Sequence, residues 1–148
     1  ACNGKGSHVL REQLAPGNYY LAVRSRDRSG GKYRLQVLST DITTTSISVG
    51  GSRLVEVPTG TSVPLTVEVT SASHGGPVEI AIDRRDPLYG WQFSTVLTGE
   101  LGTSSTLTTN WTPPWPGYWR ARARFVGTPY SSFSESGYVQ IHVAEPLE

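Results

Sequence analysis

The sequence has little of what several common kinds of protein chemistry need. Its 148 residues include one cysteine, Cys2, and no methionine, which excludes an intramolecular disulfide and a cysteine-based metal cluster. No apolar run approaches the roughly 20 residues that cross a bilayer. No segment shows convincing helix periodicity. These absences leave a chain that must fold as strands around an ordinary apolar core.

The charge balance is equally uninformative about partners. Thirteen basic and twelve acidic residues give a net charge of +1, so no overall field attracts nucleic acid or a membrane surface, and we expect neither as a partner. Scarce lysine and abundant Ser, Thr and Gly favour a secreted or cell-surface protein. Residues 1–7 lack the apolar core of a signal peptide, so we expect a mature fragment and interpret Leu147 and Glu148 as vector-derived residues.

The stretch from Asn110 to Val143 organises the rest of the chain. After a proline-rich turn the residues alternate with period two, which predicts a strand with one buried face. A second apolar alternation after a polar loop predicts an antiparallel partner strand. The predicted inner face holds Trp119, Ala121, Ala123 and Phe125, the opposite face holds Tyr118, Arg120, Arg122 and Arg124, and the partner strand holds Tyr138, Val139, Ile141 and Val143.

Shorter alternating runs precede this stretch at the spacing of a β-sandwich. Val63, Leu65, Val67 and Val69 face one way, and Val78, Ile80 and Ile82 do so in the next run. Turns are expected at 58–60, 74–77 and 86–90, and a loop at 99–103. The remaining strands are expected within 42–49, 53–57, 91–97 and 105–111, which gives seven or eight strands in about a hundred residues.

The N-terminal part repeats the ending of this pattern. Strands are expected at 8–14, 19–24 and 33–37, as a three-stranded meander. Its Pro16-Gly17 turn and Gly31-Lys32-Tyr33 strand entry match Pro116-Gly117 and Gly137-Tyr138. We therefore predict two β-modules: a partial one over residues 1–40 and a complete antiparallel immunoglobulin-like β-sandwich over 41–146. The fold class is all-β, without significant helix.

Two family resemblances agree with this division. Residues 42–144, with Val63–Val69, Val78–Asp83, Trp91-Gln92 and the run from Asn110, resemble the immunoglobulin-like repeats of bacterial extracellular proteins. Residues 8–38, with Pro16-Gly17-Asn18-Tyr19 and Gly31-Lys32-Tyr33-Arg34-Leu35, resemble the C-terminal half of the bacterial pre-peptidase C-terminal domain. The acidic positions that some members of that family use for calcium have no counterpart here. The resemblance implies a non-catalytic appendage of a secreted, multi-domain hydrolase, often a peptidase.

The arginine ladder, Arg120, Arg122 and Arg124, has two interpretations. Guanidiniums about 7 Å apart on one sheet face could hold a polyanionic glycan or a phosphate chain. Alternatively they lie opposite Glu79 and Asp83 of a neighbouring strand and form cross-strand ion pairs. The order of strands in a sandwich favours the second interpretation.

The aromatic residues also have two interpretations. Tyr89, Trp91, Trp111, Trp115 and Tyr118 lie near predicted turns, where exposed rings could stack on sugars. Alternatively Trp91, Trp111 and Trp119 fill the core while Trp115 packs on the proline turn. Trp115 and Tyr118 keep the stronger claim to binding.

No catalytic or metal-binding motif stands out. His8, His74 and His142 are too far apart for a metal-ligand spacing, and the acids Glu79, Asp83 and Asp86 lack a base partner. We expect no metal, no cofactor and no enzymatic activity of the chain itself.

The predicted function is that of a spacer or an adhesion module for substrate or matrix, attached to the catalytic domain of its parent protein. Its ligand would be a polysaccharide or an extracellular matrix protein. The candidate ligand-binding residues are Tyr89, Trp115, Tyr118, Arg120, Arg122 and Arg124. A carbohydrate-binding module using the same aromatics and a structural repeat of a cell-surface protein remain alternatives.

Overall fold

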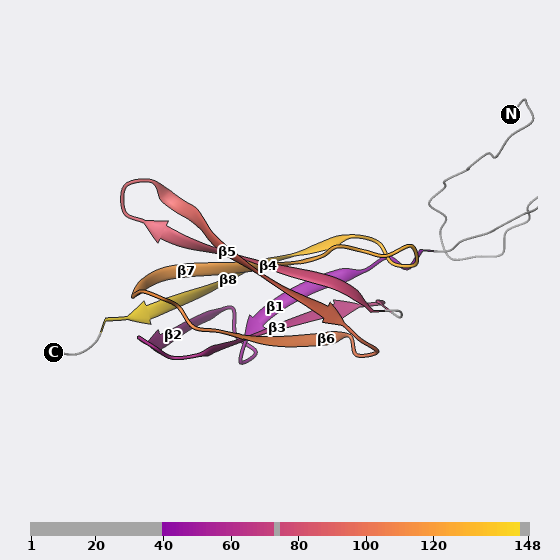
Figure 1. Cartoon of the computed structure of the whole chain (residues 1–148), viewed down its shortest axis with the longest axis horizontal. Helices are drawn as coiled ribbons and strands as arrows, with labels where there is room; N and C mark the ends of the chain where they lie inside the picture. The colour runs from indigo at the N-terminus through magenta and orange to yellow at the C-terminus, as the bar shows by residue number, and fades with distance from the viewer. Residues whose placement is uncertain (1–39, 73–74, 146–148) are drawn as a thin grey trace, which may run out of the picture. The chain divides into compact units, whose positions relative to one another are not determined.

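Strands in two sheets make up the part of the chain that the structure describes. The computed structural model describes residues 40–72 and 75–145, and Figure 1 shows the two sheets packed as layers. The chain divides into two units, Ala1–Gln36 and Val37–Glu148, and all described residues belong to the second. The strands are β1 (Thr44–Val49), β2 (Leu54–Pro58), β3 (Val63–Thr70), β4 (Gly76–Asp86), β5 (Gly90–Leu101), β6 (Thr106–Trp111), β7 (Gly117–Phe125) and β8 (Ser134–Ala144).

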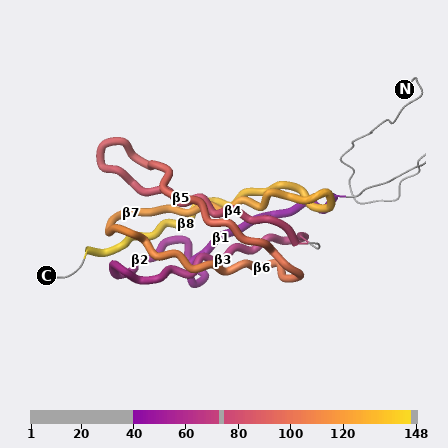
Figure 2. Tube along the Cα trace, viewed as in Figure 1, coloured from indigo at the N-terminus to yellow at the C-terminus, as the bar shows by residue number. Residues whose placement is uncertain are grey.

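The topology is that of an immunoglobulin-like sandwich. One sheet has the order β1-β3-β6 and the other β2-β8-β7-β4-β5. The first sheet and the β8-β7-β4 part of the second correspond to the A-B-E and G-F-C strands of immunoglobulin domains. Figure 2 traces the chain as it crosses between the layers. The predicted all-β fold class is confirmed, and no residue that the structure describes is helical.

One detail of the predicted sheet was wrong. We expected an antiparallel sandwich, but β2 pairs with β8 in parallel, from Leu54↔Gln140 to Pro58↔Ala144. Strand β1 lies in the first sheet, antiparallel to β3. After β1 the chain crosses to the second sheet, where β2 runs in the same direction as its neighbour β8. The second sheet is therefore mixed.

The core lies where alternation placed it. Val63, Leu65, Val67 and Val69 of β3 are fully buried, as are Ala121, Ala123 and Phe125 of β7. The rings of Trp111 and Trp119, one from each sheet, meet edge to face with centroids 5.1 Å apart, which is a favoured aromatic geometry. The two sheets thus share a single core.

Strand β5 is longer than predicted. It continues to Leu101, so the expected loop at 99–103 was wrong for its first three residues. The loop prediction relied on Gly99 as a chain breaker. Gly99 instead lies in the strand, paired with Val78, and a Cβ there would come 2.5 Å from a Leu107 methyl group on β6, so a larger residue would require the Leu107 side chain to shift.

Several predictions fall outside the described residues. These are the meander at 8–37, its likeness to the pre-peptidase module, the roles of His8 and His74, and the interpretation of Leu147 and Glu148, and all of them stay predictions. The boundary between residues 40 and 41 also stays a prediction. No helix long and apolar enough to span a membrane occurs within 40–72 and 75–145.

Candidate functional site

The outer face of the five-stranded sheet carries most of the residues that the sequence singled out. In β7 the side chains of Trp119, Ala121, Ala123 and Phe125 are buried, so Tyr118 and the arginine ladder project from the opposite, outer face. Strand β4 lies beside β7, with Asp83 opposite Arg120 and Glu79 opposite Arg124. The prediction that the arginine ladder lies opposite Glu79 and Asp83 of a neighbouring strand is confirmed.

Arg120 is the most enclosed member of the ladder. Its Nε donates to Asp83 Oδ2 at 2.8 Å. The Arg120 side chain is 25% exposed and the Asp83 side chain is 17% exposed. Its guanidinium lies 4.0 Å from the Tyr138 ring centroid and 4.6 Å from that of Trp91, within the range of cation–π attraction. Arg120 therefore joins β4, β5 and β8 through β7.

Arg122 and Arg124 share an acid that the sequence did not point to. Glu135 Oε1 accepts from Arg124 Nε at 2.9 Å, and Glu135 Oε2 lies 3.4 Å from Arg122 Nη1. The pairing expected for Arg124 with Glu79 is present but longer, at 3.9 Å. All three ladder arginines are thus paired with carboxylates, which confirms the second interpretation in a form that adds Glu135.

A bulge explains why Glu135 was missed. Across β7 and β8 the register runs Arg122↔Tyr138 and then Arg124↔Glu135, so β8 holds one extra residue. The Ala123 N–H donates to Ser136 Oγ at 2.9 Å, and that hydroxyl donates to the Gly137 carbonyl at 2.7 Å. The extra residue turns Glu135 onto the outer face. The isolated Gly137 in a strand pattern was the available signal.

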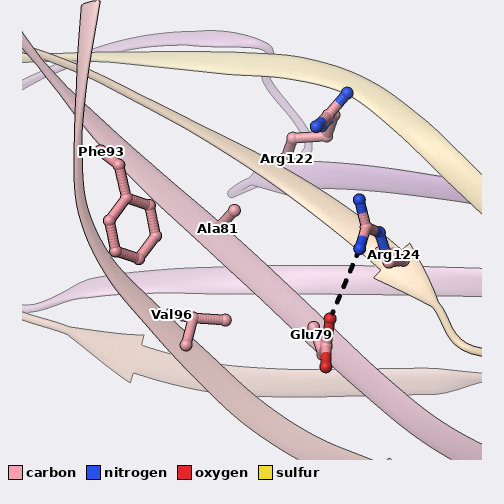
Figure 3. A pocket seen from close by; sticks show the side chains of 6 residues that line it. All are labelled: Glu79, Ala81, Phe93, Val96, Arg122 and Arg124. Carbon is pink, nitrogen blue, oxygen red and sulfur yellow. Dashed lines mark ion pairs between the residues drawn. The ribbon is translucent and has the colours of Figure 1, made fainter.

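A second bulge forms a hollow beside the ladder. The β4–β5 register shifts between Ile82 and Asp83, which brings both Phe93 and Val96 to the outer face with exposures of 68% and 46%. Ala81, a small residue, lies between these apolar side chains and Arg122. The hollow has a volume of about 270 Å³. Figure 3 shows its six lining residues and the Glu79–Arg124 ion pair.

The aromatic candidates divide between core and surface. Trp119 and Trp111 are buried, as the core interpretation expected, and Trp119 Nε1 donates to the Trp115 carbonyl at 3.1 Å. Trp91 corrects that interpretation, because the pairing Arg85↔Trp91 turns it to the outer face, where it is half-buried under Arg120. Tyr138 likewise leaves the predicted apolar face and contacts Arg120.

The remaining aromatics are exposed at one end of the sandwich. Tyr89, Trp115 and Tyr118 are 77%, 56% and 52% exposed. Antiparallel pairing of β4 with β7 puts the turn after β4 beside the start of β7, so all three belong to this end, which we call the aromatic end. Tyr118 stacks on His142 with centroids 4.4 Å apart, and Glu56 Oε1 lies 3.5 Å from His142 Nδ1.

One carboxylate has a shifted pKa. In the β4–β5 turn the backbone N–H groups of Tyr89 and Leu88 donate to Asp86 Oδ1 at 3.0 and 2.8 Å. These bonds, and more weakly the charge of Arg84, hold the pKa of Asp86 below its ordinary value. The shift has a structural cause, the capping of a turn. Within the described segments, no group of three or more His, Cys, Asp or Glu side chains is placed to hold a metal ion.

Comparisons with known proteins give only distant similarity. No protein-family model matches the chain, and no curated protein matches it. The CARDB domain of a Pyrococcus furiosus protein, solved in complex with di-metal ions, is 17% identical, covers 74% of this chain and 100% of its own, and has a TM-score of 0.40.

A second solved structure is similar to the same extent. It is a chain from a structure on T cell specificity and activation by the bacterial superantigen toxic shock syndrome toxin-1. This chain is 15% identical, covers 69% of our chain and 99% of its own, and has a TM-score of 0.40. Similarity at this level identifies neither a family nor a ligand.

Proposed function

We propose that residues 41–146 are a non-catalytic adhesion module of a secreted bacterial hydrolase, namely a peptidase. The module would tether the catalytic domain of its parent protein to a substrate or to the extracellular matrix. The supporting observation is that charged and aromatic side chains occupy different parts of the outer face. Its charged ladder is internally paired, while large aromatic side chains are exposed at the aromatic end.

The pairing supports a binding role over a catalytic one. A guanidinium that is paired with a carboxylate and packed on a ring, as Arg120 is, contributes to rigidity rather than to proton transfer. Exposed rings such as Trp115 offer apolar area that a partner can bury. A rigid sheet with exposed rings at its end is suited to adhesion.

The proposal is tested by co-sedimentation of the 148-residue chain with insoluble polysaccharides and with matrix proteins such as collagen. Binding should fall when Tyr89 and Trp115 are both changed to Ala. Phe133→Ala is the matched control, because Phe133 is similarly exposed, at 55%, but lies at the opposite end of β7. Hydrolase activity of the chain alone, or sedimentation with none of the materials, would refute the proposal.

The carbohydrate-binding alternative is favoured by one specific observation. One face of the Tyr118 ring stacks on His142. This contact orients the Tyr118 ring at the aromatic end, where the side chain is exposed. A pre-oriented ring costs little side-chain entropy when a sugar stacks on it. Tyr118→Ala should then weaken binding to polysaccharides, whereas binding to matrix proteins alone would argue against this alternative.

A further inference from the structure

A cleft opens where the β4–β5 hairpin leaves the sheet. Pairing between β4 and β7 ends at Arg84↔Trp119, whereas β4 and β5 stay paired as far as Asp86↔Gly90. The hairpin therefore extends beyond its sheet, as Figure 1 shows. The space between the hairpin and the start of β7 has a volume of about 440 Å³ and is lined by Arg84, Arg85, Pro87, Pro116, Gly117 and Tyr118.

Two prolines and a glycine shape the walls of this cleft. Pro87 follows the end of β4, and Pro116 precedes β7, and both have a fixed φ. Gly117 has a φ of +122°, a conformation that side-chain-bearing residues rarely adopt. The volume lies within the usual range of small-molecule sites, about 300–1,000 Å³, so the cleft is large enough for a small group.

The charges of the cleft differ from those of the ladder. Both of its charged lining residues are arginines, and neither makes an ion pair with a carboxylate that the structure describes. Arg84 lies 5.8 Å from the Trp119 ring centroid, near the outer limit of a cation–π contact. Consecutive strand residues project to opposite faces of β4, and both arginines are among the residues that line the cleft.

The acid that follows these arginines in the sequence makes its hydrogen bonds within the hairpin turn. Asp86 is turned into the hairpin turn, where it accepts the N–H groups of Leu88 and Tyr89. Arg84 is only the last of the causes that lower its pKa. Within the described residues, neither arginine of the cleft therefore has the carboxylate ion-pair partner that every arginine of the ladder has.

We propose that this cleft binds an acidic saccharide, that is, a sugar ring that carries a carboxylate or a sulfate. Arg84 and Arg85 would bind the anionic group through charge-assisted hydrogen bonds, and the sugar ring would stack on the fixed Tyr118 ring. A neutral sugar would leave both guanidiniums unpaired. This inference rests on the proposed adhesion function and gives it a ligand class.

Affinity electrophoresis of the full chain tests the proposal. Native gels would contain polygalacturonate, dextran sulfate, neutral dextran or no polymer. We expect retardation by at least one of the two acidic polymers and none by dextran, and the retardation should weaken between 50 and 500 mM salt. Polygalacturonate and dextran sulfate distinguish the carboxylate from the sulfate. Arg84→Gln, Arg85→Gln and Tyr118→Ala should each raise the dissociation constant about three- to tenfold.

Arg122→Gln is the matched control, because it makes the same change of charge in the paired ladder and should alter the dissociation constant less than about twofold. Tyr118→Phe keeps the ring and should retain binding. The proposal is refuted by equal mobility in all gels, by an equal effect of Arg122→Gln and Arg85→Gln, or by tighter binding of a single-stranded oligonucleotide than of either acidic polymer. Sedimentation with collagen or a neutral polysaccharide, without retardation by acidic polymers, would refute the cleft but leave the adhesion function standing.

Discussion

At the scale of single residues, two buried serines show that the same side chain can have opposite effects on stability. Ser136 Oγ accepts the Ala123 N–H inside the β7–β8 bulge, so it satisfies a backbone donor that water cannot reach. Ser131 is 1% exposed, and its Oγ has no hydrogen-bond partner. A buried polar atom costs free energy when it is unpaired and gives a modest gain when it is paired.

We therefore expect the same substitution to have opposite signs at the two positions. Ser136→Ala should lower the free energy of unfolding by about 1–3 kcal/mol, because the Ala123 N–H is left buried and unpaired. Ser131→Ala should leave it unchanged or raise it by up to about 1 kcal/mol, because only an unpaired hydroxyl is removed. Urea denaturation followed by tryptophan fluorescence measures both. Equal destabilisation by the two changes would contradict this account.

The Asp86 carboxylate should contribute a pH-dependent term to stability. Its pKa is lower in the folded chain than in the unfolded chain, so its contribution is present above the unfolded pKa and is lost as the pH falls through the folded pKa. Asp86→Asn keeps an acceptor for the two N–H groups but removes the titration. Thermal unfolding between pH 6 and pH 2 should show a smaller acid-induced loss in Asp86→Asn than in the unchanged chain. Parallel curves would show that Asp86 does not contribute.

At the scale of elements, the sequence predicts each strand well up to the point where a bulge occurs. Alternation alone identified the inner faces of β3, β4 and β7, because each has apolar residues at every second position. One extra residue exchanges the two faces of a strand. The bulges in the β4–β5 and β7–β8 pairs therefore put Trp91 and Glu135 on faces that simple alternation does not give.

The candidate site was less predictable for a related reason. The sequence shows which arginines share a face but not which carboxylates reach them, since that depends on strand order and register. The ladder attracted attention through its regular spacing, yet it is paired. Arg84 and Arg85 have no periodic pattern, and the cleft that they line depends on where pairing between β4 and β7 stops.

The members of the ladder should contribute unequally to the stability of the sheet. Arg120→Ala should lower the free energy of unfolding by about 1–3 kcal/mol, because it breaks a partly buried ion pair and two ring contacts. Arg124→Ala should cost less than about 0.5 kcal/mol, since its pairs are largely exposed. Urea denaturation of both variants checks the order. Arg120→Lys should recover only part of the loss, and equal costs for Arg120→Ala and Arg124→Ala would contradict the ranking.

At the scale of the whole sandwich, the single core makes the two sheets dependent on each other. Trp111 comes from the three-stranded sheet and Trp119 from the five-stranded sheet. Their near-ultraviolet circular dichroism should therefore report on the packing of one layer against the other.

Core truncations in either sheet should weaken the same unfolding transition. Leu65→Ala in β3 and Ile80→Ala in β4 remove fully buried side chains, and each should cost about 2–5 kcal/mol. Both should shift the midpoint of the near-ultraviolet signal as one transition. Two separate transitions in either variant would show that the sheets unfold independently.

The parallel pairing of β2 with β8 also determines how the module carries a mechanical load. Leu54 begins β2 opposite Gln140, and Ala144 ends β8 opposite Pro58. A force that pulls Leu54 and Ala144 apart therefore acts along the two strands in opposite directions. The hydrogen bonds between them are loaded in shear and share the force, instead of opening one after another from an end. The β2–β8 pair therefore resists such a force, a property that the proposed adhesion function would use.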